Sequence, residues 1–120
     1  VGYNSDGSRF LGATYDPTSH YRAARVFDFF EEQGLAPSAL RENYLRQTTM
    51  LAEALGVESP RADHGGFVAV DVQNADDVSR RLAADGVMTD SRGRHLRLGP
   101  APYLTDDQLE RAVDAVRRYT

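Results

Sequence analysis

Two long stretches in the first half of the chain repeat apolar residues at helical spacing. The first begins at Asp16, a residue type that caps helices, followed by Pro17, and it ends near Gly34. Its apolar face consists of Ala23, Val26, Phe27 and Phe30. The second begins at Pro37 and ends at Gly56. Its face consists of Leu40, Tyr44, Thr48, Leu51 and Leu55.

The spacing of apolar residues changes from helical to alternating in the second half of the chain. In GFVAVDV, residues 66–72, the three valines share one face, which is typical of a strand. VMTD, residues 87–90, and HLRL, residues 95–98, predict two further strands. We expect a turn at residues 91–94 between them.

Two shorter helices complete the pattern. The segment NADDVSRRLAADG is capped by Asn74 or Asp76. The segment TDDQLERAVDAVRRY begins with Thr105 and Gln108 at the spacing of a capping box. The core-facing residues are Val78 and Leu82 in the first of these helices and Leu109, Ala112, Val113 and Val116 in the second.

The element order α-α-β-α-β-β-α predicts an α+β fold. The economical arrangement is a small, mostly antiparallel three-stranded sheet with helices packed on one face. In the last strand Leu96 and Leu98 then point toward the helices, so Arg97 points to the uncovered face with His95. We expect residues 16–120 to form a single small domain, with residues 1–15 as an N-terminal loop.

Composition narrows the class of protein. The chain has 120 residues and a net charge of −4, which argues against an electrostatic nucleic-acid binder. No apolar run approaches the ~20 residues of a membrane span. Cysteine is absent, so disulfides and thiolate chemistry are excluded for this chain. These properties predict a cytoplasmic protein with neither nucleic acid nor membrane as its partner.

The basic residues of the chain are unusual. All 14 are arginine, so no lysine is present to form a Schiff base. His20, His64 and His95 are too scattered in the sequence to predict a metal site. Arg97 is the best candidate for binding chemistry, because a guanidinium held by a strand can bind a carboxylate through two parallel hydrogen bonds. The alternative is a solvated arginine at the surface of a small sheet.

Several segments together resemble the C-terminal end of kynureninases and related class V aminotransferase-like enzymes, which depend on pyridoxal 5′-phosphate. They are GVMTDSRGRHLRLGPAPYLTDDQLERAVDAV, which includes LRLGPAPYL, then HGGFVAVDV before it, and SRFLGATYDPTSHYRAARVFDFFEEQGL near the start. The resemblance covers nearly the whole chain but only about the last third of such an enzyme. It implies a large domain that precedes residues 1–15 and binds most of the cofactor.

The resemblance also implies roles for individual residues. Arg97 matches the small-domain arginine that binds the α-carboxylate of the amino-acid substrate, and Tyr103 either lines the same cleft or packs. Gly12 and Thr14 fall near a segment that approaches the cofactor phosphate or the substrate of a neighbouring subunit, which implies a homodimer. The lysine that binds pyridoxal phosphate belongs to the large domain, so no catalytic residue is expected in this chain. Within the family, kynureninase hydrolyses a carbon–carbon bond, whereas other members transaminate or remove sulfur.

Three hypotheses of function follow. The first is the C-terminal, substrate-carboxylate-binding domain of a kynureninase-like or class V aminotransferase-like enzyme that acts on an amino acid. The second is a stand-alone module that binds an amino acid or another carboxylate through Arg97 without catalysis. The third is an interaction domain that docks through an apolar patch around Phe67 and Ala69 on the open sheet face.

Overall fold

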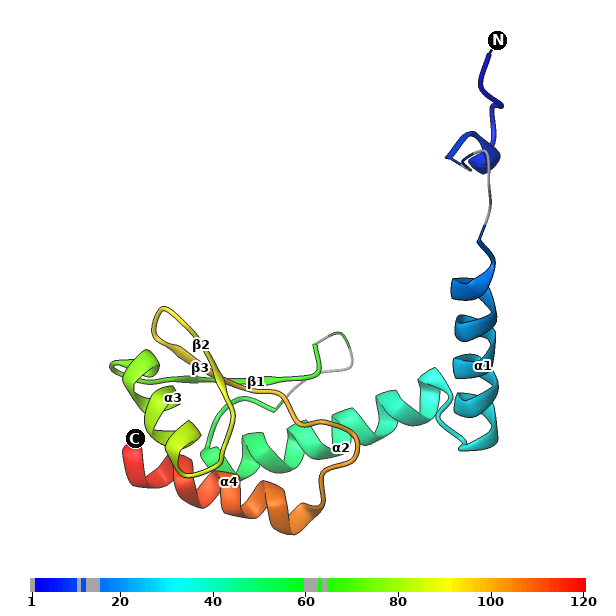
Figure 1. Ribbon diagram of the computed structural model, residues 1–120. Helices are drawn as coiled ribbons and strands as arrows, with labels where there is room; N and C mark the ends of the chain where they lie inside the picture. The colour runs from blue at the N-terminus through cyan, green and yellow to red at the C-terminus, as the bar shows by residue number, and fades with distance from the viewer. Residues whose placement is uncertain (1, 11, 13–15, 60–62, 64) are drawn as a thin grey trace. The chain divides into compact units, whose positions relative to one another are not determined.

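The computed structural model describes residues 2–10, 12, 16–59, 63 and 65–120 and divides the chain into two compact units (Figure 1). The first unit comprises Val1–Ala36 and the second Pro37–Thr120. The described residues form four α-helices, one short 3₁₀ helix and a three-stranded antiparallel sheet, which confirms the α+β class and the expected element order. None of these helices is long and apolar enough to cross a membrane.

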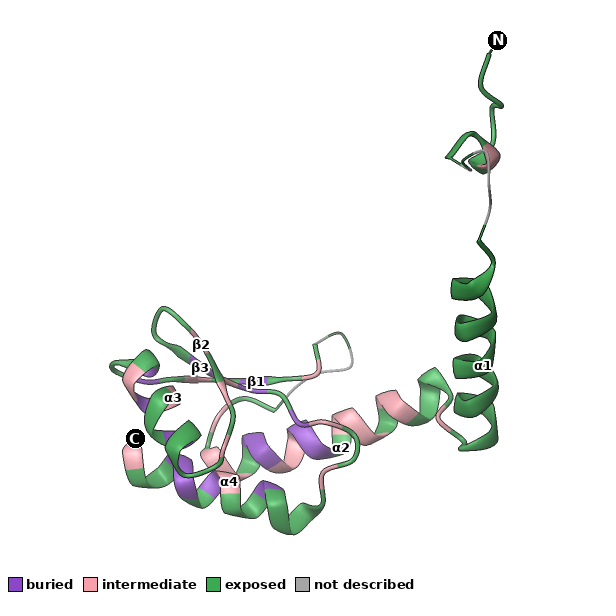
Figure 2. Cartoon of the chain, in the orientation of Figure 1, coloured by how far each residue is buried: buried purple, intermediate pink, exposed green. Residues whose placement is uncertain are grey.

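The first unit contains η1, Gly7–Phe10, a single turn where the sequence predicted only loop, and α1, Thr18–Glu32. Helix α1 begins just after Pro17, and the carboxylate of Asp16 accepts hydrogen bonds from the backbone N–H and the hydroxyl of Thr18. All of α1 is exposed, including the predicted apolar face (Figure 2). Phe27 is 68% exposed and Phe30 40%. The predicted apolar face is therefore exposed in the described part of the first unit.

The sheet of the second unit has the strand order β1-β3-β2. Strands β1, Val68–Asp71, and β2, Asp90–Arg92, both pair antiparallel with the central strand β3, His95–Leu98. Two residues, Gly93 and Arg94, join β2 to β3, and Gly93 has a φ of +59°. A glycine at the first position of a two-residue hairpin turn supplies the positive φ that a tight connection needs.

The prediction for the second strand was wrong in its bounds. Residues 87–89 are not part of the sheet, and the turn is shorter than the predicted 91–94. The reason is that Val87 closes the end of the preceding helix, where its N–H bonds to the carbonyl of Leu82, and the hydroxyl of Ser79 bonds to the carbonyl of Thr89. These backbone groups are satisfied by the helix instead of by a neighbouring strand.

Helices α2, Pro37–Leu55, α3, Ala75–Ala84, and α4, Asp106–Tyr119, supply the rest of the core. The capping box of Thr105 and Gln108 is confirmed. Of the two N-cap candidates for α3, Asn74 occupies the position, but its side chain makes no capping hydrogen bond. The buried apolar residues are Leu51, Ala52, Val68, Val72, Ala75, Val78, Leu82, Leu96, Leu98, Leu109, Val113, Ala115 and Val116.

The end of α3 is tied to the end of α4 by one carboxylate. Asp85 accepts hydrogen bonds from the Arg118 guanidinium at 3.0 Å and from the Tyr119 hydroxyl at 2.9 Å. The hydrogen bond from Arg118 is the main reason that the pKa of Asp85 lies below its ordinary value. The same carboxylate, as acceptor, raises the pKa of Tyr119. A charge-assisted contact therefore fixes the last turn of the chain.

Because every buried residue of the described chain lies in the second unit, residues 37–120 should fold without residues 1–36. We expect a fragment of residues 37–120 to unfold cooperatively, with a Tm within about 2 °C of the full chain. Thermal unfolding followed by circular dichroism measures this. A fragment that lacks a cooperative transition would contradict the assignment of the core to the second unit alone.

Candidate functional site

Arg97 lies in the central strand, on the sheet face that the helices leave open. Its neighbours in β3, Leu96 and Leu98, are 0% and 4% exposed, whereas the Arg97 side chain is 32% exposed. The predicted division of this strand into a buried and an open face is confirmed. Across the sheet, Arg97 pairs with Ala69 of β1 and with Asp90 of β2. Arg97 is thus held at the middle of the open face by two neighbouring strands.

Two side chains orient the Arg97 guanidinium. The Phe67 ring stacks on it, with 4.4 Å between the ring centroid and the Arg97 Cζ atom. The Asp90 carboxylate lies 3.2 Å from Nη1. The Nε atom is buried and has no hydrogen-bond partner among the described residues. A guanidinium offers five N–H donors in a fixed plane, so this group retains donor capacity for an anionic ligand.

Charged residues dominate the rest of the open face. Arg94 forms an ion pair with Asp71 at 3.0 Å, and His95 is exposed between β1 and β2. Phe67 and Ala69 are exposed as well, but Phe67 already carries the Arg97 guanidinium. The face is therefore a charged surface with one aromatic ring, which gives the interaction-domain hypothesis little apolar area to use.

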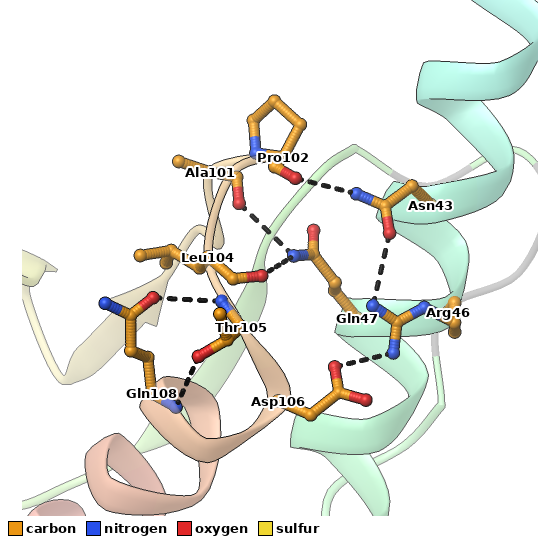
Figure 3. Close-up of polar contacts among 9 residues, drawn as sticks. All are labelled: Asn43, Arg46, Gln47, Ala101, Pro102, Leu104, Thr105, Asp106 and Gln108. Atoms are coloured by element: carbon orange, nitrogen blue, oxygen red, sulfur yellow. Dashed lines mark hydrogen bonds and ion pairs between the residues drawn. The ribbon is translucent and has the colours of Figure 1, made fainter.

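The loop that follows Arg97 is held by polar side chains of α2 (Figure 3). Gln47 is fully buried, and its Nε2 donates to the carbonyls of Ala101 and Leu104 at 3.2 and 3.3 Å. Asn43 donates to the carbonyl of Pro102 at 3.2 Å. Since two prolines leave this loop few N–H donors of its own, side chains from another element satisfy its carbonyls.

An ion pair also joins α2 to the start of α4 (Figure 3). Arg46 donates to Asp106 at 2.7 Å and to the Asn43 side-chain oxygen at 3.2 Å. Sequence reasoning missed all three α2 residues as part of the site. Gln47 could have been found, because it lies three residues after Tyr44 and four before Leu51 and so falls on the predicted apolar face.

Of the remaining predicted site residues, Tyr103 is the one that the structure describes in the same unit as Arg97. Tyr103 is 83% exposed and lines a groove of about 680 Å³ between the end of α3, the loop at 98–104 and α4, whose lining does not include Arg97. Gly12 is exposed and belongs to the first unit. Thr14 lies outside the described residues.

The chain's own donor set does not fit a covalently held pyridoxal phosphate, because it has no lysine to condense with the cofactor aldehyde. Among the described residues, no three histidine, aspartate or glutamate side chains gather where a metal ion could bind. The candidate site in this chain therefore consists of the Arg97 guanidinium with Phe67 and Asp90 in contact with it.

The chain matches the model of a known protein family. The family described as Kynureninase C-terminal domain matches residues 22–116, well over half of the chain. This range includes α2, the sheet and Arg97, and it ends inside α4. No curated protein and no solved structure matches the chain.

Replacing Gln47 with leucine tests the attachment of the loop to α2. Leucine is close to glutamine in size but removes the side-chain donor to the carbonyls of Ala101 and Leu104. The Ala101 carbonyl then keeps the backbone N–H of Leu104 as its donor. We expect a loss of about 1–3 kcal/mol in the free energy of unfolding, measured by urea denaturation. The control is Gln73→Leu, because Gln73 is exposed and should change stability by less than about 0.5 kcal/mol. Equal stability of the two variants would contradict the role of Gln47.

Proposed function

The chain belongs to the kynureninase C-terminal domain family, and from this membership we propose that it is the substrate-carboxylate-binding domain of an enzyme that acts on an amino acid. Kynureninases depend on pyridoxal 5′-phosphate, which in this proposal is held by a large partner domain. Arg97 binds the α-carboxylate of the substrate. The observation that carries the proposal is the half-buried Arg97 guanidinium on the open face, whose buried Nε has no acceptor within the part of the chain that the structure describes.

The surroundings of Arg97 support this role. The hydrogen-bonded central strand limits movement of its backbone, and the Phe67 ring limits rotation of the guanidinium plane. A planar guanidinium with unused donors matches the two oxygens of a carboxylate. The attachment of the next loop to α2 keeps the end of β3 fixed relative to the core. An arginine oriented in this way needs little rearrangement to bind an anion.

Chemistry at the cofactor is left to the partner domain. Pyridoxal phosphate supplies electron withdrawal from the bound amino acid, and the lysine that attaches it must come from outside this chain. Gly12 and Thr14 remain candidates for contact with the cofactor phosphate, and Tyr103 for contact with the substrate. A homodimer with shared sites is part of the same proposal.

Helix α1 supports the existence of a large partner domain. Its aromatic side chains are exposed along the helix, with Phe27 at 68% and Phe29 at 46%. The exposed large apolar residues of α1 are Tyr21, Val26, Phe27, Phe29 and Phe30. A run of exposed aromatic residues on one helix is typical of a surface that another structure covers. In this proposal the large domain of the enzyme covers the exposed face of α1.

Substitution of Arg97 in the complete enzyme, which carries the large domain and the cofactor, tests the proposal. With L-kynurenine as the first amino-acid substrate, we expect Arg97→Ala to lower kcat/KM about 10- to 100-fold through the loss of charge-assisted hydrogen bonds. Arg97→Lys should recover only part, because lysine keeps the charge without the planar fork. The control is Arg94→Ala, which removes an exposed arginine of the same face and should leave kcat/KM unchanged.

The native gene product distinguishes this function from a stand-alone binding module. We expect intact-mass measurement to find these residues within a chain several times heavier than 13.3 kDa that carries the visible absorbance of bound pyridoxal phosphate. A colourless product of 13.3 kDa would contradict the enzymatic function and favour the non-catalytic carboxylate-binding module.

A further inference from the structure

Around Arg97, the open face of the sheet carries more positive than negative side chains. Asp90 lies directly opposite Arg97 in the antiparallel pair of β2 and β3. Arg92, two residues further along β2, points to the same face because side chains alternate along a strand. Two guanidinium groups therefore share one carboxylate, and this group of three residues carries a net charge of +1.

The contacts of Asp90 show how the carboxylate is shared. A single oxygen, Oδ2, lies 3.2 Å from the Arg97 Nη1 atom and 3.4 Å from the Arg92 Nε atom. The other oxygen, Oδ1, accepts the backbone N–H of Ser91 at 2.9 Å. The Asp90 side chain is 54% exposed, so water and small ions reach it. The backbone N–H of Ser91 thus holds one oxygen of Asp90, while the other oxygen contacts both Arg97 and Arg92.

The neighbouring ion pair on the same face differs in this respect. The Nε and Nη2 atoms of Arg94 both lie 3.0 Å from the same carboxylate oxygen of Asp71, Oδ1. That pair is balanced, with one carboxylate for one guanidinium. Among the described residues of the face, the excess positive charge therefore lies at Arg97 and Arg92, which share the Asp90 carboxylate.

We infer that Asp90 is an exchangeable counter-ion, which contacts both Arg97 and Arg92 in this structure and keeps only Arg92 when a ligand carboxylate binds Arg97. This inference rests on the proposed function and adds the way in which the site is regulated. After the exchange Asp90 is paired with Arg92, and the ligand carboxylate supplies the second negative charge. Phe67 keeps the guanidinium plane in place while its partner changes. Asp90 therefore lowers the affinity of Arg97 for carboxylates and prevents weak anions from occupying it.

The experiment measures carboxylate binding to Arg97 in the 120-residue chain. Protein labelled with ¹⁵N-arginine is titrated with sodium benzoate at constant ionic strength, and the Nε–H resonance that Arg97→Lys removes reports on the site. Benzamide, which has the same ring without the charge, is the ligand control. Circular dichroism confirms that each variant is folded.

We expect Asp90→Asn to tighten benzoate binding about two- to fivefold, because the resident competitor is removed. Asp90→Ser should act in the same direction. The matched control, Asp71→Asn, makes the same charge change on the same face, but Asp71 lies opposite His95 and pairs with Arg94 instead of Arg97. It should tighten binding by less than about 1.5-fold, because an exposed charge without a direct contact acts weakly in water.

Arg92 provides the second test, since the inference makes it the receiver of Asp90. Arg92→Ala should weaken benzoate binding more than Arg94→Ala does in the otherwise unchanged chain. In the Asp90→Asn background the two arginine substitutions should have equal effects, because no carboxylate is left to be received. Additive effects of Asp90→Asn and Arg92→Ala would show that the two residues act independently.

The two proposals fail in different ways. If benzoate moves the Arg97 resonance but Asp90→Asn leaves the affinity unchanged or weakens it, Asp90 only positions Arg97 and the exchange is overturned. If benzoate moves the Arg97 resonance neither in the unchanged chain nor in Asp90→Asn, the carboxylate-binding function of this chain fails instead.

Discussion

The alternation of side chains along β3 is the constraint on which the second unit depends. This strand is central and has only four residues, and its two leucines must both reach the helices because they are among the most buried side chains of the chain. A strand has a period of two, so burial of Leu96 and Leu98 forces His95 and Arg97 to the opposite face. The energy of the hydrophobic core therefore fixes the direction of a charged residue that is not part of the core.

The second requirement is that the loop after β3 satisfies its backbone. The segment Gly99–Leu104 contains two prolines and turns sharply between the sheet and α4. Its carbonyls cannot all pair locally, and α2 supplies donors from Gln47 and Asn43. A buried amide in a helix costs free energy unless it is paired, so Gln47 links the helix and the loop into one cooperative structure.

Periodicity predicted most of the fold because the signals were local. The capping box at Thr105, the valine alternation of β1 and the direction of Arg97 all depend on residues within a few positions of one another. The second strand was misplaced because Val87 is apolar and β-branched, yet it packs at the end of α3. Gln47 was missed because its acceptors lie 54 and 57 residues away. Phe67 and Asp90 meet Arg97 only through strand pairing, which sequence spacing does not specify.

Because the turn of the β2–β3 hairpin has only two residues, the site tolerates substitutions in β2 better than insertions in the turn. Pairing of Asp90 with Arg97 follows from the length of the connection at Gly93 and Arg94. An inserted residue there must either form a bulge or slide β2 by one position, which brings Ser91 opposite Arg97 and turns the acidic side chain to the other face. Point substitutions in β2 can change the charge beside Arg97 in small steps. A change in the length of the turn removes the Asp90 carboxylate from that face at once. Single substitutions can therefore change the charge beside Arg97, whereas its position opposite Arg97 depends on the hairpin length.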